Sequence, residues 1–263
     1  FSTFNVKDFT MKKIQLLCFA ILIAVVSSCK SKQTTVDNTS SAKKFNEKTF
    51  DPHFKGLGTE PFWNIEISDD FIVYKDIDGK SEVFPVNSID KAQDANVQLI
   101  RSEKGNQQLR VTISQKSCSD GMSDTEFDYK TEISIISKEN ELKLNGCGNY
   151  IIPLKLQGKW NLISFNGAEI PQDKYLKTPY LQFENEEKHV SGNASCNGFN
   201  GSIFFDNQYI RFSKLGVTRM MCVHENMEQE FLKEIATITK YKIIDSELHL
   251  FKGDELKMIF KKE

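Results

Sequence analysis

The chain has 263 residues, of which 39% are hydrophobic and 27% are charged, so it can bury a core and is not a disordered segment. Its 34 Lys and Arg residues nearly balance its 36 Asp and Glu residues, and the net charge is -2. This balance supplies no basic field for nucleic acid and no acidic field for cationic partners. We therefore expect no nucleic-acid partner.

Residues 11–28 have the organisation of a signal peptide. Two lysines precede the apolar run Ile14–Val26, which as a helix spans about 20 Å and is too short for a hydrocarbon core of about 30 Å. Ser27 and Ser28 lie directly before Cys29, and this pattern resembles the lipobox of bacterial lipoproteins, in which cleavage precedes a diacylated cysteine. We predict that Cys29 is lipidated with acyl chains such as palmitate; the alternative is an apolar helix with an incidental cysteine.

The segments on either side of this signal peptide are also assigned from the sequence. Residues 1–10 are interpreted as an upstream extension, and residues 29–53, rich in Lys, Ser, Thr and Asn, as a flexible tether. Acyl chains would make the lipid bilayer a partner of the protein. Acidic residues are sparse after Cys29, unlike the surface-export signal of some lipoproteins, so we predict an outer-membrane anchor that faces the periplasm.

Alternating apolar and polar residues predict an N-terminal β domain over residues 54–154. Turn-forming sequences such as Asp78-Gly79 and Lys104-Gly105-Asn106 separate the runs. The runs expected to form strands are Phe71–Tyr74, Val97–Ile100, Leu109–Ile113 and Ile133–Ile136.

A second β domain is predicted over residues 155–263. One segment, from about Glu225 to Thr239, has a helical period that places Met227, Phe231 and Ile235 on one stripe. The fold class is therefore predicted to be mainly β, with two small antiparallel β-barrel or roll domains, the second carrying one packed α-helix. The strands expected in the second domain are Gly158–Leu162, Tyr180–Phe183, Ser202–Phe205, Tyr209–Phe212 and Leu256–Phe260.

Four cysteines remain once Cys18 in the signal and Cys29 are set aside, and in an exported chain they are disulfide candidates. They are Cys118, Cys147, Cys196 and Cys222. Three pairings are possible; local pairing would place one bridge in each domain and contribute about 2 to 4 kcal/mol per bridge. The alternatives are free buried thiols and reactive or metal-bound cysteines, although no Cys-x-x-Cys occurs.

Several separated motifs of the second half occur in a recognisable order. They are Leu156–Leu162, Gly192–Gly201, Thr218–Cys222 and Glu228–Leu232. Together they make residues 156–262 resemble the META domain family, which includes a heat-inducible bacterial lipoprotein associated with novobiocin resistance. The resemblance implies an all-β domain with one helix, found on exported or envelope proteins and without an established enzymatic activity.

The first half is similar to a less characterised envelope family. The resemblance rests on Gly58–Trp63, with the sequence Gly-Thr-Glu-Pro-Phe-Trp, on Cys118–Asp124, and on Gly146–Gly148. It implies no known activity.

Two motifs of the second half are candidate sites. Glycines and asparagines surround Cys196 within Gly192–Gly201, and they predict a structural corner rather than a phosphate cradle, because the following residues have the pattern of a strand, not a helix. Arg219, Met220 and Met221 form a candidate binding edge; the alternative is that both methionines pack in the core while Cys222 forms a bridge.

No motif predicts a catalytic site. The four histidines are far apart and are expected at the surface, and Asp120 is expected to cap a turn rather than to bind calcium together with Asp124. We therefore predict no enzymatic activity, no cofactor and no metal.

The sequence is best interpreted as a non-catalytic envelope lipoprotein that supports envelope integrity or stress and drug tolerance, including the heat-shock response. Its expected partners, besides the bilayer, are an envelope protein or a small apolar ligand. The alternatives are a lipid or small-ligand carrier or inhibitor, and a thiol-dependent redox protein that uses Cys196 or Cys222.

Overall fold

The computed structural model describes residues 43–138, 140–171, 177–184, 188–223 and 226–263. The predicted extension, the signal peptide, Cys29 and the tether as far as residue 42 lie outside these residues. Within the described ranges, no helix has both the length and the apolar character needed to cross a membrane.

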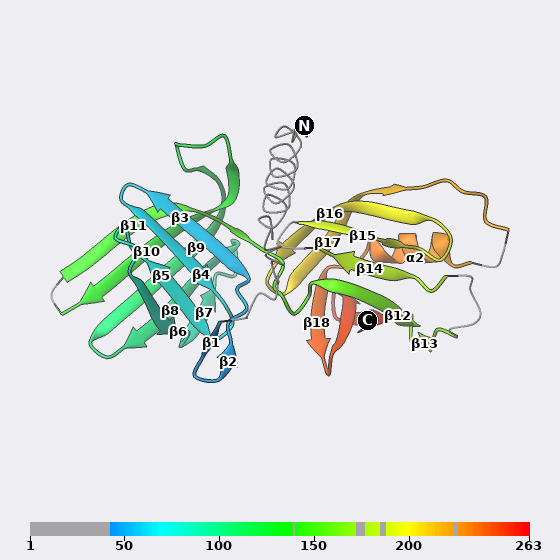
Figure 1. Cartoon of the computed structure of the whole chain (residues 1–263), viewed down its shortest axis with the longest axis horizontal. Coiled ribbons are helices and arrows are strands. Elements are labelled where there is room, and N and C mark those ends of the chain that lie inside the picture. The colour runs from blue at the N-terminus through cyan, green and yellow to red at the C-terminus, as the bar shows by residue number, and fades with distance from the viewer. Residues whose placement is uncertain (1–42, 139, 172–176, 185–187, 224–225) are drawn as a thin grey trace, which may run out of the picture. The chain divides into compact units, whose positions relative to one another are not determined.

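The first sheet is antiparallel and has nine strands (Figure 1). In chain order they are β3 (Phe54–Thr59), β4 (Phe62–Ile67), β5 (Phe71–Lys75), β6 (Ser81–Pro85), β7 (Ser88–Lys91), β8 (Val97–Lys104), β9 (Gln107–Ser119), β10 (Glu126–Ser137) and β11 (Asn140–Tyr150). Their order across the sheet is β6-β5-β4-β3-β11-β10-β9-β8-β7, so β6 and β7 are its edges. The sheet is a curled, open half-barrel.

The alternating sequence explains which face of this sheet is buried. On β9, Leu109, Val111 and Ile113 are almost fully buried, whereas Arg110 between them is exposed. The hairpin of β1 (Lys44–Phe45) and β2 (Lys48–Thr49) precedes the sheet, and Phe50 packs against Phe71. Folded structure thus begins within the segment that was expected to be a tether.

The second sheet also has nine antiparallel strands. In chain order they are β12 (Gly158–Phe165), β13 (Ala168–Glu169), β14 (Tyr180–Phe183), β15 (His189–Asn193), β16 (Gly198–Asp206), β17 (Tyr209–Val217), β18 (Lys240–Ile244), β19 (Glu247–Lys252) and β20 (Glu255–Lys262). The sheet curls back on itself because β12 pairs with both β14 and β20. The strands β17 and β18 are joined at the pair Tyr209 and Lys240. The mainly β class is confirmed.

The helix α2 (Glu228–Ile235) follows β17 and is shorter than the predicted segment Glu225–Thr239. Its apolar stripe is as expected, because Phe231 and Ile235 are buried in the core. Met227 lies at the N-cap and contributes to the same core although it precedes the helix. Acidic residues in the first turn suit the positive end of the helix dipole.

In the sequence, residues 151–157 separate the strands of the first sheet from those of the second. The predicted domain boundary between residues 154 and 155 falls in this segment and stays a prediction.

Trp63 on β4 and Trp160 on β12 are both 1% exposed, and Trp160 Nε1 donates to the Leu156 carbonyl at 2.7 Å. Both tryptophans therefore pack in the core rather than presenting a ring to a ligand.

Candidate functional site

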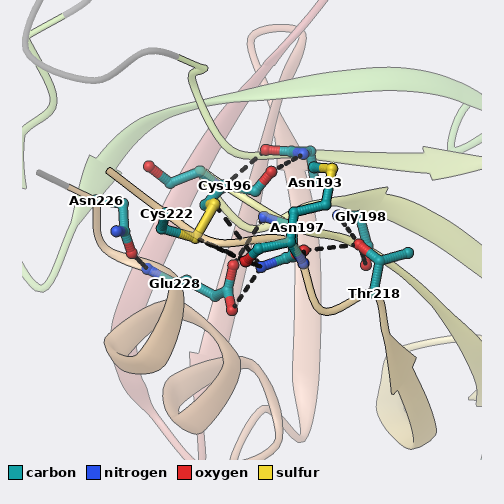
Figure 2. Close-up of a disulfide and its surroundings, with 10 residues drawn as sticks. Asn193, Cys196, Asn197, Gly198, Thr218, Cys222, Asn226 and Glu228 are labelled. Carbon is teal, nitrogen blue, oxygen red and sulfur yellow. Dashed lines mark hydrogen bonds between the residues drawn. A yellow bond between two sulfur atoms is a disulfide. The ribbon is translucent and has the colours of Figure 1, made fainter. Parts of the chain in front are cut away.

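The second disulfide joins a tight hairpin connection, Asn193–Gly198, to a loop outside the sheet. This connection is called the corner below. Strands β15 and β16 pair as far as Asn193 and Gly198, and Cys196 lies in the tight connection between them. Cys196 is bridged to Cys222, with 6.1 Å between their Cα atoms, as local pairing of the cysteines predicted. Figure 2 shows this bridge beside Asn197 and Glu228.

Asn197 is the hub of the corner and is only 3% exposed. Its Oδ1 accepts hydrogen bonds from the Met220 amide at 2.7 Å and from Thr218 Oγ1 at 2.9 Å. Its Nδ2 donates to the Met220 carbonyl at 3.3 Å. The side-chain amide thus pairs with the Met220 backbone in both directions, as a neighbouring strand would, and fixes the loop that carries Met220.

Glu228 links the helix to this hub. The Asn197 backbone amide donates to Glu228 Oε2 at 2.7 Å, and Asn197 Nδ2 donates to Glu228 Oε1 at 3.3 Å. Since α2 begins at Glu228, the start of the helix fixes where the carboxylate lies. The same Nδ2 lies 3.5 Å from Cys222 Sγ and 3.7 Å from Cys196 Sγ, so one amide contacts both sulfurs and the carboxylate.

The corner has the turn geometry that its asparagines and glycines predict. Asn193 Oδ1 accepts from the Ser195 amide at 2.9 Å, and Ser195 has a φ of 90°, in the region that favours glycine. A Cβ added at Gly192 would lie 2.2 Å from the Tyr180 carbonyl oxygen, so the strands require glycine there. The expected structural corner is present, and β16 follows it as a strand.

The loop of the candidate binding edge is exposed. Met220 is 57% exposed, Met221 89% and Val223 76%, and Arg219 beside them is exposed as well. The alternative is therefore wrong about the two methionines, which do not pack in the core, and right about the bridge from Cys222. The hydrogen bonds of Asn197 and the Cys222 bridge hold the loop at its base, so its apolar side chains remain in solvent.

The first disulfide, Cys118–Cys147, also has the predicted pairing and borders a groove of about 260 Å³. The groove is lined by Leu57–Thr59 of β3, Lys116–Ser119 of β9 and Asn145–Cys147 of β11, with Asp120 and Lys130 beside them. The three motifs of the first half therefore meet at one place. Two lysines and three hydroxyl groups line this groove together with apolar atoms.

Asp120 caps a turn beside the groove, as expected. The backbone amides of Ser123 and Met122 donate to its carboxylate at 2.9 and 3.0 Å and hold its pKa below the usual range. The carboxylate is thus engaged by its own loop.

His53 contradicts the expectation that the histidines lie at the surface, because it is 4% exposed. Burial lowers its pKa from the usual value to about 4, since an apolar environment disfavours the imidazolium. Asp69, whose Oδ1 lies 3.6 Å from His53 Nδ1, opposes this shift, whereas Lys155 and Lys91 reinforce it. His189 is exposed as expected, and His224 lies outside the described residues.

Sequence reasoning named the four bridged cysteines as disulfide candidates and Arg219–Met221 as a candidate edge, but it missed the hydrogen bonds that connect the second bridge to this edge. Asn197 was assigned a local turn role, yet its main partners lie 21 to 31 residues away. The motif containing Glu228 was recognised only as part of the family pattern. The spacing between Asn197 and Glu228 carries no periodic signal that would have joined them.

Comparison with known proteins places the second half of the chain in a family. No curated protein matches. A protein solved by NMR is similar at 24% sequence identity; the alignment covers 40% of this chain and 89% of the solved chain, with a TM-score of 0.33. The family model of the META domain matches residues 153–263, which include the corner, the exposed loop and α2. Residues 153–263 of this chain are a META domain.

Proposed function

We propose that this chain is a lipid-anchored envelope protein that acts by binding, without catalysis, and supports envelope integrity under stress. The META domain supports the coarser part of this proposal, because its family is associated with the cell envelope. The proposed anchor is an acylated Cys29 in the outer membrane, facing the periplasm. The proposed contact surface is the exposed loop Arg219–Val223.

The observation that carries the binding role is the construction of this loop. Exposed apolar side chains are normally scattered, but here Met220, Met221 and Val223 lie within four residues. The loop is held by a disulfide and by Asn197, so little conformational entropy is lost when a partner contacts it. A rigid apolar loop with an adjacent cation, Arg219, suits an envelope protein with an apolar, acidic-rimmed surface.

Complementation of a deletion strain tests the binding role. The strain receives the wild-type chain or the variant Met220→Ser/Met221→Ser, and growth is compared under heat, detergent and novobiocin. We expect the variant to accumulate normally and to fail to restore tolerance. Full tolerance with the variant would show that the loop is not the contact surface. A strain with Ile77→Ser, a substitution of an exposed apolar residue in a turn of the first half, controls for a general effect of apolar-to-polar change.

Intact-mass spectrometry of the protein from native membranes tests the anchor. We expect the mature chain to begin at Cys29, with the mass of its acyl chains and no free thiols. Substitution Cys29→Ala should move the protein out of the membrane fraction. Unchanged fractionation of this variant would remove the anchor from the proposal.

A second candidate function is carriage or inhibition through a small ligand, and the groove beside Cys118–Cys147 favours it. Extraction of the purified protein with organic solvent, followed by mass spectrometry, tests whether a lipid or other small molecule co-purifies. A thiol-dependent redox function is the third candidate. It predicts rapid labelling of Cys196 or Cys222 in protein that has not been reduced.

A further inference from the structure

The second disulfide has a carboxylate close to both of its sulfurs. The Sγ atoms of Cys196 and Cys222 and a carboxylate oxygen of Glu228 all lie within 4.8 Å of one another (Figure 2). All three residues are partly buried, so the cluster is shielded but reachable. Among the described residues, Cys118 and Cys147 belong to no comparable group of three potential ligands.

We propose that reduction of the Cys196–Cys222 disulfide converts this corner into a binding site for a thiophilic divalent cation such as Zn²⁺. A dithiol reductant supplies two electrons and two protons, the S–S bond breaks, and the reductant becomes a disulfide. On binding the cation, both thiols release their protons to solvent. Two thiolates and the Glu228 carboxylate are then the protein ligands, and water completes a tetrahedral site.

The donor set decides which class of cation suits the site. Thiolates are soft ligands and favour zinc over calcium or magnesium, which prefer six or more oxygen ligands. Two sulfurs and one carboxylate oxygen are a ligand set that Zn²⁺ accepts with an open fourth position.

The surrounding hydrogen bonds would hold the ligands in place after the S–S bond is broken. The Ala194 amide donates to the Asn197 carbonyl at 2.9 Å and keeps Cys196 in the corner. Asn197 pairs with Met220 in both directions, which keeps the Cys222 loop near the corner. These bonds do not involve the disulfide. Its reduction loosens the loop, and these bonds together with the bound cation then keep the ligands near one another.

Asn197 would act as the supporting partner of the metal ligands. Its Nδ2 contacts both sulfurs, and an N–H donor stabilises the negative charge of a thiolate. Its backbone amide donates to Glu228 Oε2 at 2.7 Å and its Nδ2 donates to Oε1 at 3.3 Å, so the carboxylate is held beside the sulfurs. The positive end of the α2 dipole adds to this stabilisation.

Titration of the reduced protein with Zn²⁺ and with Co²⁺ tests the proposal. The protein is reduced with a phosphine, and Zn²⁺ binding is followed by competition with a chromophoric chelator. We expect one tightly bound Zn²⁺ per reduced chain, none in the oxidised chain, and a thiolate-to-cobalt charge-transfer band with Co²⁺. The variant Cys118→Ser/Cys147→Ser should retain this ion, and Cys196→Ser/Cys222→Ser should lose it.

Two further variants test whether Zn²⁺ binding requires Glu228 and Asn197 or only the two free thiols. Glu228→Gln should weaken Zn²⁺ binding by at least about tenfold, and Asn197→Ala by about 10- to 100-fold. Glu230→Gln, on the same helix turn but exposed, should leave affinity unchanged. Equal affinity in the Glu228→Gln and Glu230→Gln variants would overturn the proposal, as would the absence of Zn²⁺ binding in the reduced chain.

Thermal melting tests whether the corner stays folded after reduction. Zn²⁺ should raise the Tm of the reduced wild-type protein but not that of the Cys196→Ser/Cys222→Ser variant. If the reduced protein loses its corner and Zn²⁺ does not restore the Tm, the proposal is wrong.

Discussion

The two disulfides have nearly equal loop lengths but very different surroundings. Cys118–Cys147 joins β9 to β11 across β10, within strands that already pair along their length. Cys196–Cys222 joins a tight corner to a loop that lies outside the sheet. The first bridge therefore reinforces a structure that hydrogen bonds define, whereas the second defines the position of a segment that presents exposed apolar side chains.

Removal of the bridges one at a time should produce the largest effect. The sequence separations of 29 and 26 residues predict a loss of about 3.5 kcal/mol in unfolding free energy for each bridge. The two variants, Cys118→Ser/Cys147→Ser and Cys196→Ser/Cys222→Ser, are compared by urea unfolding. Hydrogen exchange should distinguish them, because only the second is expected to deprotect the loop around Met220.

Equal protection of this loop in both variants would contradict the comparison. It would mean that Asn197 holds the loop without help from the covalent bond.

Substitution of Asn197 by alanine should have the next largest effect. It removes the side-chain partner of the Met220 amide and one of the two hydrogen bonds that Glu228 accepts from Asn197, while the bond from the backbone amide of residue 197 remains. The loss of these buried side-chain bonds predicts about 3 kcal/mol of destabilisation. Asn200→Ala, an exposed asparagine on β16, is the matched control and should change the unfolding free energy little. A similar cost for both variants would show that the hub contributes no more than a surface residue.

The first sheet shows what alternation can and cannot predict. The strand around Leu109–Ile113 was found from sequence because its apolar residues alternate with polar ones. Strand β11 was missed because its sequence is polar and rich in glycine, and its formation depends on pairing with β10 and β3. A Cβ at Gly146 would lie 2.0 Å from the Leu57 carbonyl oxygen, so glycine marks close approach here rather than a break.

The candidate site was predictable in its covalent part and not in its hydrogen-bonded part. Cysteines of a chain predicted to be exported were expected to pair, and of the three possible pairings the structure has the local one, with one bridge in each predicted domain. The contacts of Asn197 with Met220 and Glu228 depend instead on how a loop and a helix pack against a corner. Such contacts follow from tertiary packing and leave no period in the sequence.

The buried His53 gives the first sheet a pH dependence that the corner does not share. Its pKa is about 4 when folded and about 6.5 when unfolded, so the unfolded chain binds more protons between these values. Stability should therefore fall as the pH falls, by about 2 kcal/mol between pH 7 and pH 5. Urea unfolding of the wild type and of His53→Gln across this range measures the difference.

His189→Gln is the control for this measurement because His189 is exposed. It should retain the pH dependence of the wild type, whereas His53→Gln should flatten it. A flat wild-type profile between pH 7 and pH 5 would mean that folding leaves the pKa of His53 unchanged, with Asp69 offsetting the effect of burial.

Substitution of the exposed methionines should have the smallest effect on the unfolding free energy. The proposed function predicts that the same substitution has a large effect on stress tolerance in the cell. Met221 is 89% exposed and Met220 57%, so Met220→Ser/Met221→Ser should change the unfolding free energy by less than about 0.5 kcal/mol. Met227→Ala, a substitution of a methionine that is 5% exposed, should cost about 2 kcal/mol or more. Because the loop variant keeps its stability, any loss of stress tolerance in its strain reflects a lost contact rather than a lost protein. Destabilisation of the loop variant to the level of Met227→Ala would instead place these methionines in the core and leave the corner without a surface to present.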